Sequence, residues 1–146
     1  GHSNVMWWLL QHTPDNGYDM DKALHYAVKN GDIALTEWLT SHGGHVCTSK
    51  AMDDAAANGH LDVVKWLHEN RDEGCTSRAM DGAAIGGHLR VIQWLHENTS
   101  QGCTTGAMDG AAVYGYLDVV KCLHFTTNGD GRSGSKRAPS CCPVVA

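Results

Sequence analysis

Apolar residues recur along this chain in two alternating patterns, and each is typical of a helix. In residues 51–56 small apolar residues are spaced i, i+1, i+4 and i+5, which places them on one narrow helical face. Residues 61–67 follow with a wider apolar face that includes Trp66. Gly59 stands between the two and suits the left-handed conformation that ends a helix. Because no apolar–polar alternation of period two appears, the pattern predicts an all-α helix–turn–helix unit.

This unit is repeated along the chain. The segment "AMDDAAANGHLDVVKWLHEN" at 51–70 returns as "AMDGAAIGGHLRVIQWLHEN" at 79–98 and as "AMDGAAVYGYLDVVKCLHFT" at 107–126, with a period of 28 residues. Its second half also matches "GDIALTEWLTSH" at 31–42 and "VMWWLLQH" at 5–12. A repeat of this period indicates stacked helix pairs, since one pair cannot cover its own apolar faces.

The period divides the chain into segments. We expect a repeat array over 4–126, with a half repeat at 4–14 and units at about 19–44, 47–72, 75–100 and 103–126. The threonines that recur before the first helices are predicted N-caps: Thr48, Thr76 and Thr104. Residues 1–3 look like a cloning remnant. Residues 127–146 are expected to be a flexible or loosely packed tail, because Pro139 and Pro143 would disrupt a further first helix.

The unit resembles the ankyrin repeat, whose pattern is T-P-L-H-x-A-A-x-x-G-H-x-x-V-V-x-x-L-L. Leu24-His25 stand in the L-H-x-A element, Gly59-His60 form the Gly-His pair, and Val63-Val64 form the V-V pair. The array is also similar to the short-period ankyrin arrays abundant in oomycete proteins. Its 28-residue period is shorter than the roughly 33 residues of the family. The missing residues fall between the helix pairs, so the resemblance implies an ankyrin-like helix–turn–helix solenoid with shortened or absent β-hairpin fingers.

The same resemblance implies a non-catalytic module that binds a partner protein through a concave face formed by the first helices. The x positions of L-H-x-A-A-x-x-G differ between units while the scaffold positions stay constant, as a binding strip on a reused frame would. The predicted partner-binding residues are Tyr26, Lys29, Asp54, Asn58, Gly82, Ile85, Val113 and Tyr114.

Two alternatives to this binding strip stay open. The variation could be drift at unconstrained surface positions, and the chain could be a structural segment of a longer array with no recognition role. Glycine lowers helix propensity by about 1 kcal/mol relative to Ala. Gly82, Gly86 and Gly110 are therefore easier to explain if something approaches the helix backbone closely.

Periodic cysteines suggest a less favoured alternative, a metal- or redox-active protein. Cys47, Cys75 and Cys103 recur with the period, and His68 and His96 each lie seven residues from a periodic Cys. Zinc sites use closer pairs. Stacked repeats are about 10 Å apart, whereas a disulfide needs Cα atoms within about 7 Å. We therefore expect buried thiols, no metal, no cofactor and a reducing, intracellular compartment.

Other periodic residues have structural interpretations. The family resemblance implies that His60 and His88 tie neighbouring repeats together by hydrogen bonds. The tryptophans that share one position of the second helices are predicted to form a stacked indole spine: Trp38, Trp66 and Trp94. The Asp of each A-M-D is expected to interact with the amide-rich start of a helix. No nucleophile–base–acid set stands out, so the chain is not expected to be an enzyme.

The net charge and the hydropathy of the chain limit the classes of partner that we expect. Residues 1–130 carry 8 Lys and Arg against 16 Asp and Glu, and residues 131–146 add Arg132, Lys136 and Arg137. An acidic body repels phosphate backbones, so a nucleic acid is not expected and a basic protein partner is favoured. No apolar run approaches the roughly 18 residues of a membrane span. We expect a monomer without membrane association.

Overall fold

The computed structural model describes residues 3–12, 19–42, 49–70, 72 and 74–128. Within these ranges every regular element is a helix, which confirms the predicted all-α class. The helices are α1 (Ser3–His12), α2 (Met20–Asn30), α3 (Ile33–Ser41), α4 (Ser49–Ala57), α5 (Leu61–Asn70), α6 (Ser77–Ile85), α7 (Leu89–Asn98), α8 (Thr105–Val113) and α9 (Leu117–Asn128).

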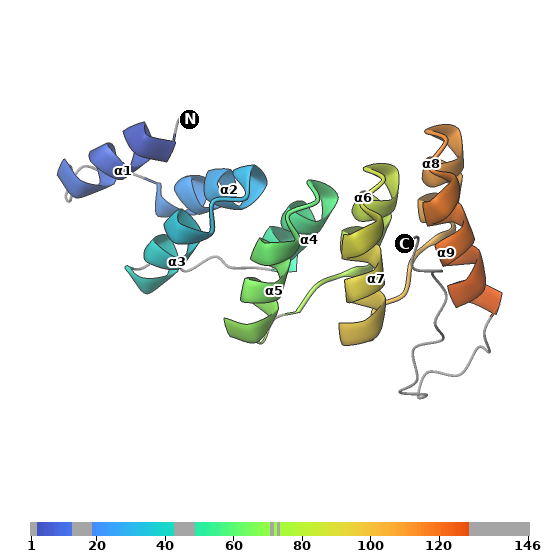
Figure 1. Ribbon diagram of the computed structural model, residues 1–146. Helices are drawn as coiled ribbons and strands as arrows, with labels where there is room; N and C mark the ends of the chain where they lie inside the picture. Colours follow the sequence, from blue (N-terminus) through green and yellow to red (C-terminus); the bar gives the residue numbers. More distant parts are fainter. Residues whose placement is uncertain (1–2, 13–18, 43–48, 71, 73, 129–146) are drawn as a thin grey trace, which may run out of the picture.

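The helices form antiparallel pairs that succeed one another along an array (Figure 1). The first helices α2, α4, α6 and α8 contact one another in that order, and so do the second helices α3, α5, α7 and α9. Helix α1 precedes the first complete pair. Matching segments of the sequence therefore lie beside each other in space, which is the arrangement of a repeat solenoid.

Local signals in the sequence set the ends of the helices. Thr76 is the N-cap of α6 and its hydroxyl accepts the backbone N–H of Arg78 at 3.1 Å, while Thr104 caps α8 in the same way. Gly59 follows α4 with φ of +80°. The Gly59 N–H donates to Ala56 O and the next N–H donates to Ala55 O. This pattern satisfies the last carbonyls of the helix and starts the turn into α5.

The core consists of small residues on the first helices and larger aliphatic residues on the second helices. Ala55, Ala56, Ala83 and Ala84 have no exposed surface, and Ile92 is equally buried. Alanine side chains let neighbouring first helices approach closely, whereas the second helices fill the space beneath them with leucine, valine and isoleucine. The difference between the two apolar faces in the sequence corresponds to these two roles.

The linkers between helix pairs contain no strand in the part that is described. Residues 74–76 and 99–104 run from one pair to the next without regular structure. The prediction of shortened or absent fingers is therefore confirmed for these two linkers. Residues 43–48 of the preceding linker, with Cys47 and Thr48, lie outside the described residues. The predicted tail from 129 onward, with Cys141 and Cys142, also lies outside them, and α9 itself continues to Asn128.

The tryptophans do not form the continuous indole stack that the sequence suggested. Trp7 meets Trp38 edge-on at 5.5 Å between ring centroids, but Trp94 is met edge-on by His68 at 5.2 Å. Trp38 also stacks on His42 of its own helix at 4.2 Å. Trp38, Trp66 and Trp94 are only half-buried against the core. In the described part of the chain no ring contact joins Trp38 to Trp66 or Trp66 to Trp94, and the His68 ring lies against Trp94 instead.

Candidate functional site

The eight residues predicted to bind a partner belong to the first helices and the turns that follow them. Five of them are exposed: Lys29, Asn58, Ile85, Val113 and Tyr114. The exposed fraction is 44% for Ile85, 81% for Val113 and 62% for Tyr114. The other three, Tyr26, Asp54 and Gly82, are half-buried. We call the surface formed by the first helices the first-helix face.

Two grooves run between neighbouring first helices. One, of about 310 Å³, lies between α2 and α4, and its lining includes Asp21, His25 and Lys50. The other, of about 560 Å³, lies between α4 and α6, and its lining includes Asp54 and Arg78. Charged groups of both signs line these grooves. The acidic character of the whole chain is therefore not concentrated on the first-helix face.

Asp54 is already engaged inside the protein. Its Oδ2 lies 3.1 Å from Nδ1 of His25 on the neighbouring first helix. This oxygen is buried, and the approach of His25 does not have hydrogen-bond geometry. The carboxylate therefore faces α2 at least as much as it faces the groove, which makes Asp54 a weaker candidate for a direct partner contact than its sequence position suggested.

Asn58 also makes a contact within its own helix. Its side-chain amide donates to Asp54 O at 2.8 Å, and Asn30 donates to Tyr26 O in the same way at 2.7 Å. These asparagines satisfy carbonyls at the ends of their helices.

The glycines of the first helices are explained by helix packing. A Cβ on Gly82 would lie 2.7 Å from the Ala57 Cβ of α4, and one on Gly110 would lie 2.6 Å from Ile85 Cγ1 of α6. Something does approach these backbones closely, as the sequence suggested, and it is the neighbouring repeat. The close approach that suggested Gly82 as a partner contact is therefore explained by packing between neighbouring repeats.

Periodic aspartates connect each first helix to the next. Asp53 accepts hydrogen bonds from the backbone N–H and the hydroxyl of Thr76, at 2.9 and 2.6 Å. Asp81 accepts the same two bonds from Thr104, at 2.8 and 2.7 Å. These contacts confirm, for Asp53 and Asp81, that the Asp of A-M-D interacts with the start of a helix. They give it a structural role as the acceptor that orients the N-cap of the next repeat.

Aromatic and imidazole rings connect the turns. The ring of His60 packs on Gly31, that of His88 on Gly59 and that of Tyr116 on Gly87, and a Cβ on each glycine would lie within 2.6 Å of the ring. The Nε2 of His60 also lies 2.8 Å from Lys29 O of the preceding repeat. The predicted inter-repeat hydrogen bond is therefore confirmed for His60.

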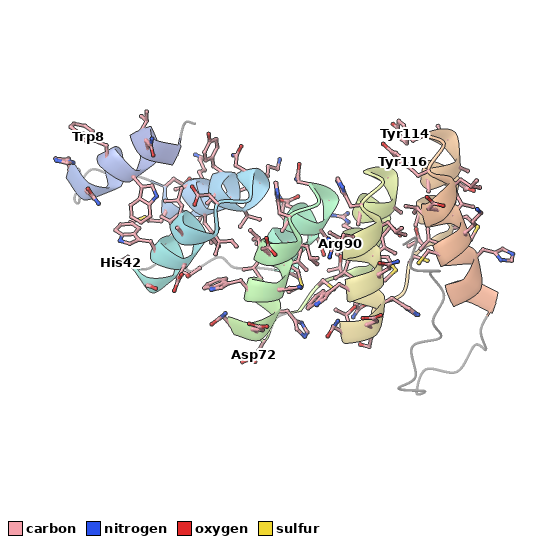
Figure 2. All side chains as sticks on the ribbon, in the orientation of Figure 1. Trp8, His42, Asp72, Arg90, Tyr114 and Tyr116 are labelled. Carbon is pink, nitrogen blue, oxygen red and sulfur yellow. The ribbon has the colours of Figure 1, made fainter. Side chains whose placement is uncertain are left out.

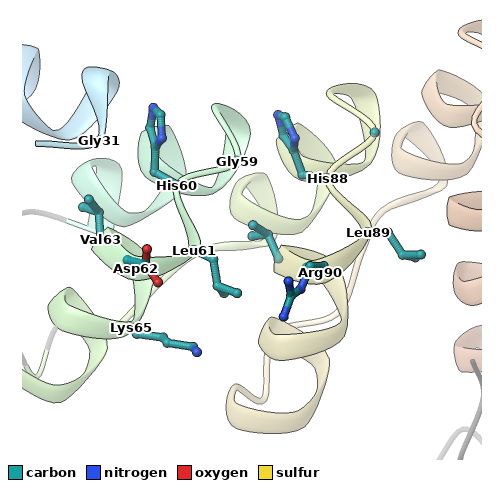
Figure 3. A pocket seen from close by; sticks show the side chains of 12 residues that line it. Gly31, Gly59, His60, Leu61, Asp62, Val63, Lys65, His88, Leu89 and Arg90 are labelled. Atoms are coloured by element: carbon teal, nitrogen blue, oxygen red, sulfur yellow. The ribbon is translucent and has the colours of Figure 1, made fainter. Parts of the chain in front are cut away.

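A third groove was not anticipated from the sequence. It has a volume of about 600 Å³ and lies between the starts of α5 and α7, where Lys65 extends from α5 toward α7 (Figure 3). His60, His88 and Arg90 line it as well. His60 and His88 repeat the Gly-His pair, whereas Arg90 stands at the repeat position of Asp62 and Lys65 at that of Gln93. This variation on the second helices was a signal that a comparison limited to the first helices did not use.

The periodic cysteines that the structure describes are thiols at the junctions between repeats. Burial raises the pKa of the Cys75 thiol; a hydrogen bond with Thr99 opposes this effect, and the Asp53 carboxylate adds to it. Burial likewise raises the pKa of Cys103, with a further contribution from Asp81. Among the described residues no group of three His, Cys, Asp or Glu side chains is placed to hold a metal ion.

Comparisons with known proteins agree with the repeat architecture. A family model described as ankyrin repeats (3 copies) matches residues 1–81, which is more than half of the 146 residues. The match begins at residue 1, includes α1 and ends within α6. A search of curated proteins found no match. None of the helices in the described ranges is both long and apolar enough to cross a membrane.

Proposed function

Because the chain belongs to the ankyrin-repeat family, whose members generally serve as protein–protein interaction modules, we propose that it binds a partner protein through the first-helix face. The observation that carries this proposal is that positions of this face that vary between the repeats also expose their side chains. Three positions of this face differ between the repeats at 51–70, 79–98 and 107–126, and two of these positions expose Ile85, Val113 and Tyr114. Exposed aromatic and aliphatic side chains are suited to act as anchors in an interface.

We rank the predicted contacts by their burial and by the contacts that they already make. Ile85 and Tyr114 are the leading anchors, and Tyr114 stands at the α8 end of the array with its ring centroid 6.4 Å from that of Tyr116 (Figure 2). Lys29 and Asn58 offer polar contacts nearer the other end. Tyr26 and Asp54 contribute through the surface that remains exposed beside the grooves. Gly82 offers no side chain to a partner and instead lets α6 pack closely on Ala57 of α4.

We infer the charge of the partner from the net charge of the chain and from the charges that line the two first-helix grooves. The formal net charge of −5 favours encounter with basic proteins at a distance. The mixed charges in the two first-helix grooves favour a partner that presents both signs at close range. Ankyrin-repeat proteins are typically not enzymes, and we propose a non-catalytic monomer that acts in a reducing intracellular compartment, where the thiols of Cys75 and Cys103 persist.

The test compares two surface variants of the full chain in affinity capture. Ile85→Ser combined with Tyr114→Ser removes both anchors, whereas Trp8→Ser removes an aromatic residue of similar exposure, 58%, from α1. Proteins captured by the wild-type chain and by Trp8→Ser, but lost with the double variant, would support the proposal. Capture that is unchanged by the double variant would contradict it and favour a structural segment without a recognition role.

A further inference from the structure

The groove between α5 and α7 has positive side chains at positions where the neighbouring repeats have negative or neutral ones. Lys65 of α5 and Arg90 of α7 line this groove from its two sides (Figure 3), and Asp62 is the acidic residue in its lining. Its volume of about 600 Å³ falls within the roughly 300–1,000 Å³ that is typical of ligand clefts. We call it the second-helix groove. With two cations and one carboxylate it is locally positive, although the formal net charge of the chain is −5.

The repeat pattern does not account for these two cations. At the equivalent positions between α3 and α5 the residues are Glu37 and Asp62. Between α7 and α9 they are Gln93 and Asp118. The two neighbouring junctions of second helices thus present carboxylates, whereas the junction between α5 and α7 presents two cations. A basic pair has replaced an acidic pattern at one place in the array.

The packing of α5 against α7 gains no ion pair from this basic pair. Lys65 is half-buried and Arg90 is exposed. In the described part of the chain the ion pairs lie at the start of α2 and between α2 and α4, and neither groove cation takes part in one. Like charges that line one groove repel each other. The cations therefore do not stabilise the free array, and a ligand with negative charge would offset their repulsion.

The two histidines of the groove hold the repeats together. The Nε2 of His60 lies 2.8 Å from Lys29 O of the preceding repeat, and the His88 ring packs on Gly59. His88 is also the N-cap residue of α7, and its side chain makes no capping hydrogen bond. The partial positive charge at the start of α7 is therefore not offset by a side-chain cap, and it adds to the attraction of the two cations for an anionic group.

Aliphatic side chains form much of the remaining lining. Leu61 and Leu89 are half-buried, and Val63 and Val91 are each 1% exposed. A ligand that fits this lining has negative groups for the cations and an aliphatic group for the two leucines. An acidic peptide with an aliphatic residue between its carboxylates has both. A nucleic acid has no aliphatic side chain, and its phosphates would be repelled by a chain of net charge −5.

We propose that the second-helix groove binds an acidic segment of a partner protein. One carboxylate of the segment pairs with Lys65, another accepts hydrogen bonds from the guanidinium of Arg90, and an aliphatic side chain between them packs on the two leucines. Carboxylates bind a guanidinium group in a two-point geometry, and such charge-assisted hydrogen bonds are about twice as strong as neutral ones. This surface belongs to the second helices, so the proposal does not rest on the binding of a partner at the first-helix face.

A titration of the full-length chain with synthetic peptides tests the groove. The probe is an acetylated and amidated peptide with the core Glu-Leu-Glu. Its control has the core Gln-Leu-Gln, which keeps the size and removes the charge. In amide NMR spectra the acidic probe should shift the signals of residues 59–65 and 87–91 in a saturable way and leave those of residues 105–113 in place. The neutral peptide should bind about tenfold more weakly, because it cannot form the two ion pairs.

Matched substitutions locate the interaction. Lys65→Gln should weaken binding of the acidic probe about fivefold, and its combination with Arg90→Gln should weaken it about tenfold or more. Lys121→Gln makes the same change of charge at the same repeat position of α9. It should leave the affinity within about twofold, because exposed charges outside the groove are screened by salt. Lys65→Glu combined with Arg90→Glu should transfer binding to a peptide with the core Lys-Leu-Lys.

The opposite results would overturn the proposal. A lack of saturation up to about 1 mM acidic peptide would exclude a site of measurable affinity. Equal weakening by Lys65→Gln and Lys121→Gln would indicate a general effect of charge. Shifts of the same amides at rising concentrations of the protein alone would identify a second copy as the occupant, and tighter binding of a single-stranded oligonucleotide would identify a nucleic acid. None of these measurements involves Ile85 or Tyr114, so their failure leaves the proposal for the first-helix face untouched.

Discussion

Asp53 accepts two hydrogen bonds from a single residue of the next repeat, one from the backbone N–H of Thr76 at 2.9 Å and one from its hydroxyl at 2.6 Å. The same hydroxyl oxygen accepts the N–H of Arg78. One threonine thus caps its own helix and satisfies a carboxylate that is only 8% exposed. The packing of consecutive repeats and the start of a helix depend on the same side chain.

Replacing Thr76 by Val should therefore destabilise the array. The substitution keeps the shape of the side chain but removes both the cap and a donor to a nearly buried carboxylate, so we expect a loss of about 2–3 kcal/mol in the free energy of unfolding. Urea denaturation followed by circular dichroism measures it. Thr76→Ser retains the hydroxyl and should cost less than about 1 kcal/mol. Equal losses for Val and Ser would show that the hydroxyl is not the important group.

The glycines that begin the turns allow a matched comparison. Gly59 has φ of +80° and faces the ring of His88, whereas Gly115 has φ of +78° and no described neighbour within 4 Å. Alanine at either position should lower the free energy of unfolding by about 1–2 kcal/mol, because its Cβ is strained in the left-handed conformation. Gly59→Ala should cost about 1–3 kcal/mol more, because its methyl group displaces the His88 ring. Thermal unfolding of both variants tests this, and similar midpoints would exclude the ring contact as the cause.

Gly82→Ala should destabilise the protein although Ala is the better helix former. The expected propensity gain of about 1 kcal/mol is outweighed by overpacking of about 1–3 kcal/mol, because the new Cβ would lie 2.7 Å from that of Ala57. Combining it with Ala57→Gly removes the other methyl group. A double-mutant cycle should then give a favourable coupling. If Gly82→Ala stabilised the chain, the glycine would need another explanation, such as close approach of a partner.

The thiol of Cys75 should react slowly with alkylating reagents. Burial raises its pKa in the folded chain, so at pH 8 it carries less of the reactive thiolate than an unfolded thiol does. Modification by iodoacetamide, followed by peptide mass spectrometry, should be slower in native protein than in urea. Since the folded state keeps the proton to higher pH, stability should also fall as the pH rises above the ordinary thiol value of 9.0. Equal rates of Cys75 modification in native protein and in urea would contradict the burial of this thiol.

Much of the fold was predictable because its determinants are local. The two apolar periods, the caps at Thr76 and Thr104 and the left-handed Gly59 each depend on a few neighbouring residues. The 28-residue repeat then implied that equivalent segments lie side by side. The helical class and the short linkers followed from these facts, and the described residues bear them out.

The predictions that were wrong concerned contacts between repeats. The indoles of Trp66 and Trp94 share a repeat position, but sharing a position does not bring two rings within stacking distance. Gly82 appeared to make room for a ligand, and it makes room for Ala57. The groove between α5 and α7 was missed because it lies between second helices, whereas the sequence argument for a binding surface used only the variable positions of the first helices.

The sequence by itself determined the helix pairs, their order and which positions vary between copies, because propensity, capping and periodicity act within a few turns of chain. Only the tertiary structure decided which atoms of one repeat meet the next: Asp53 with Thr76, Gly59 with His88, and His25 with Asp54. These contacts depend on the distance and rotation between stacked helices, which many side chains set jointly and which no single position in the sequence specifies.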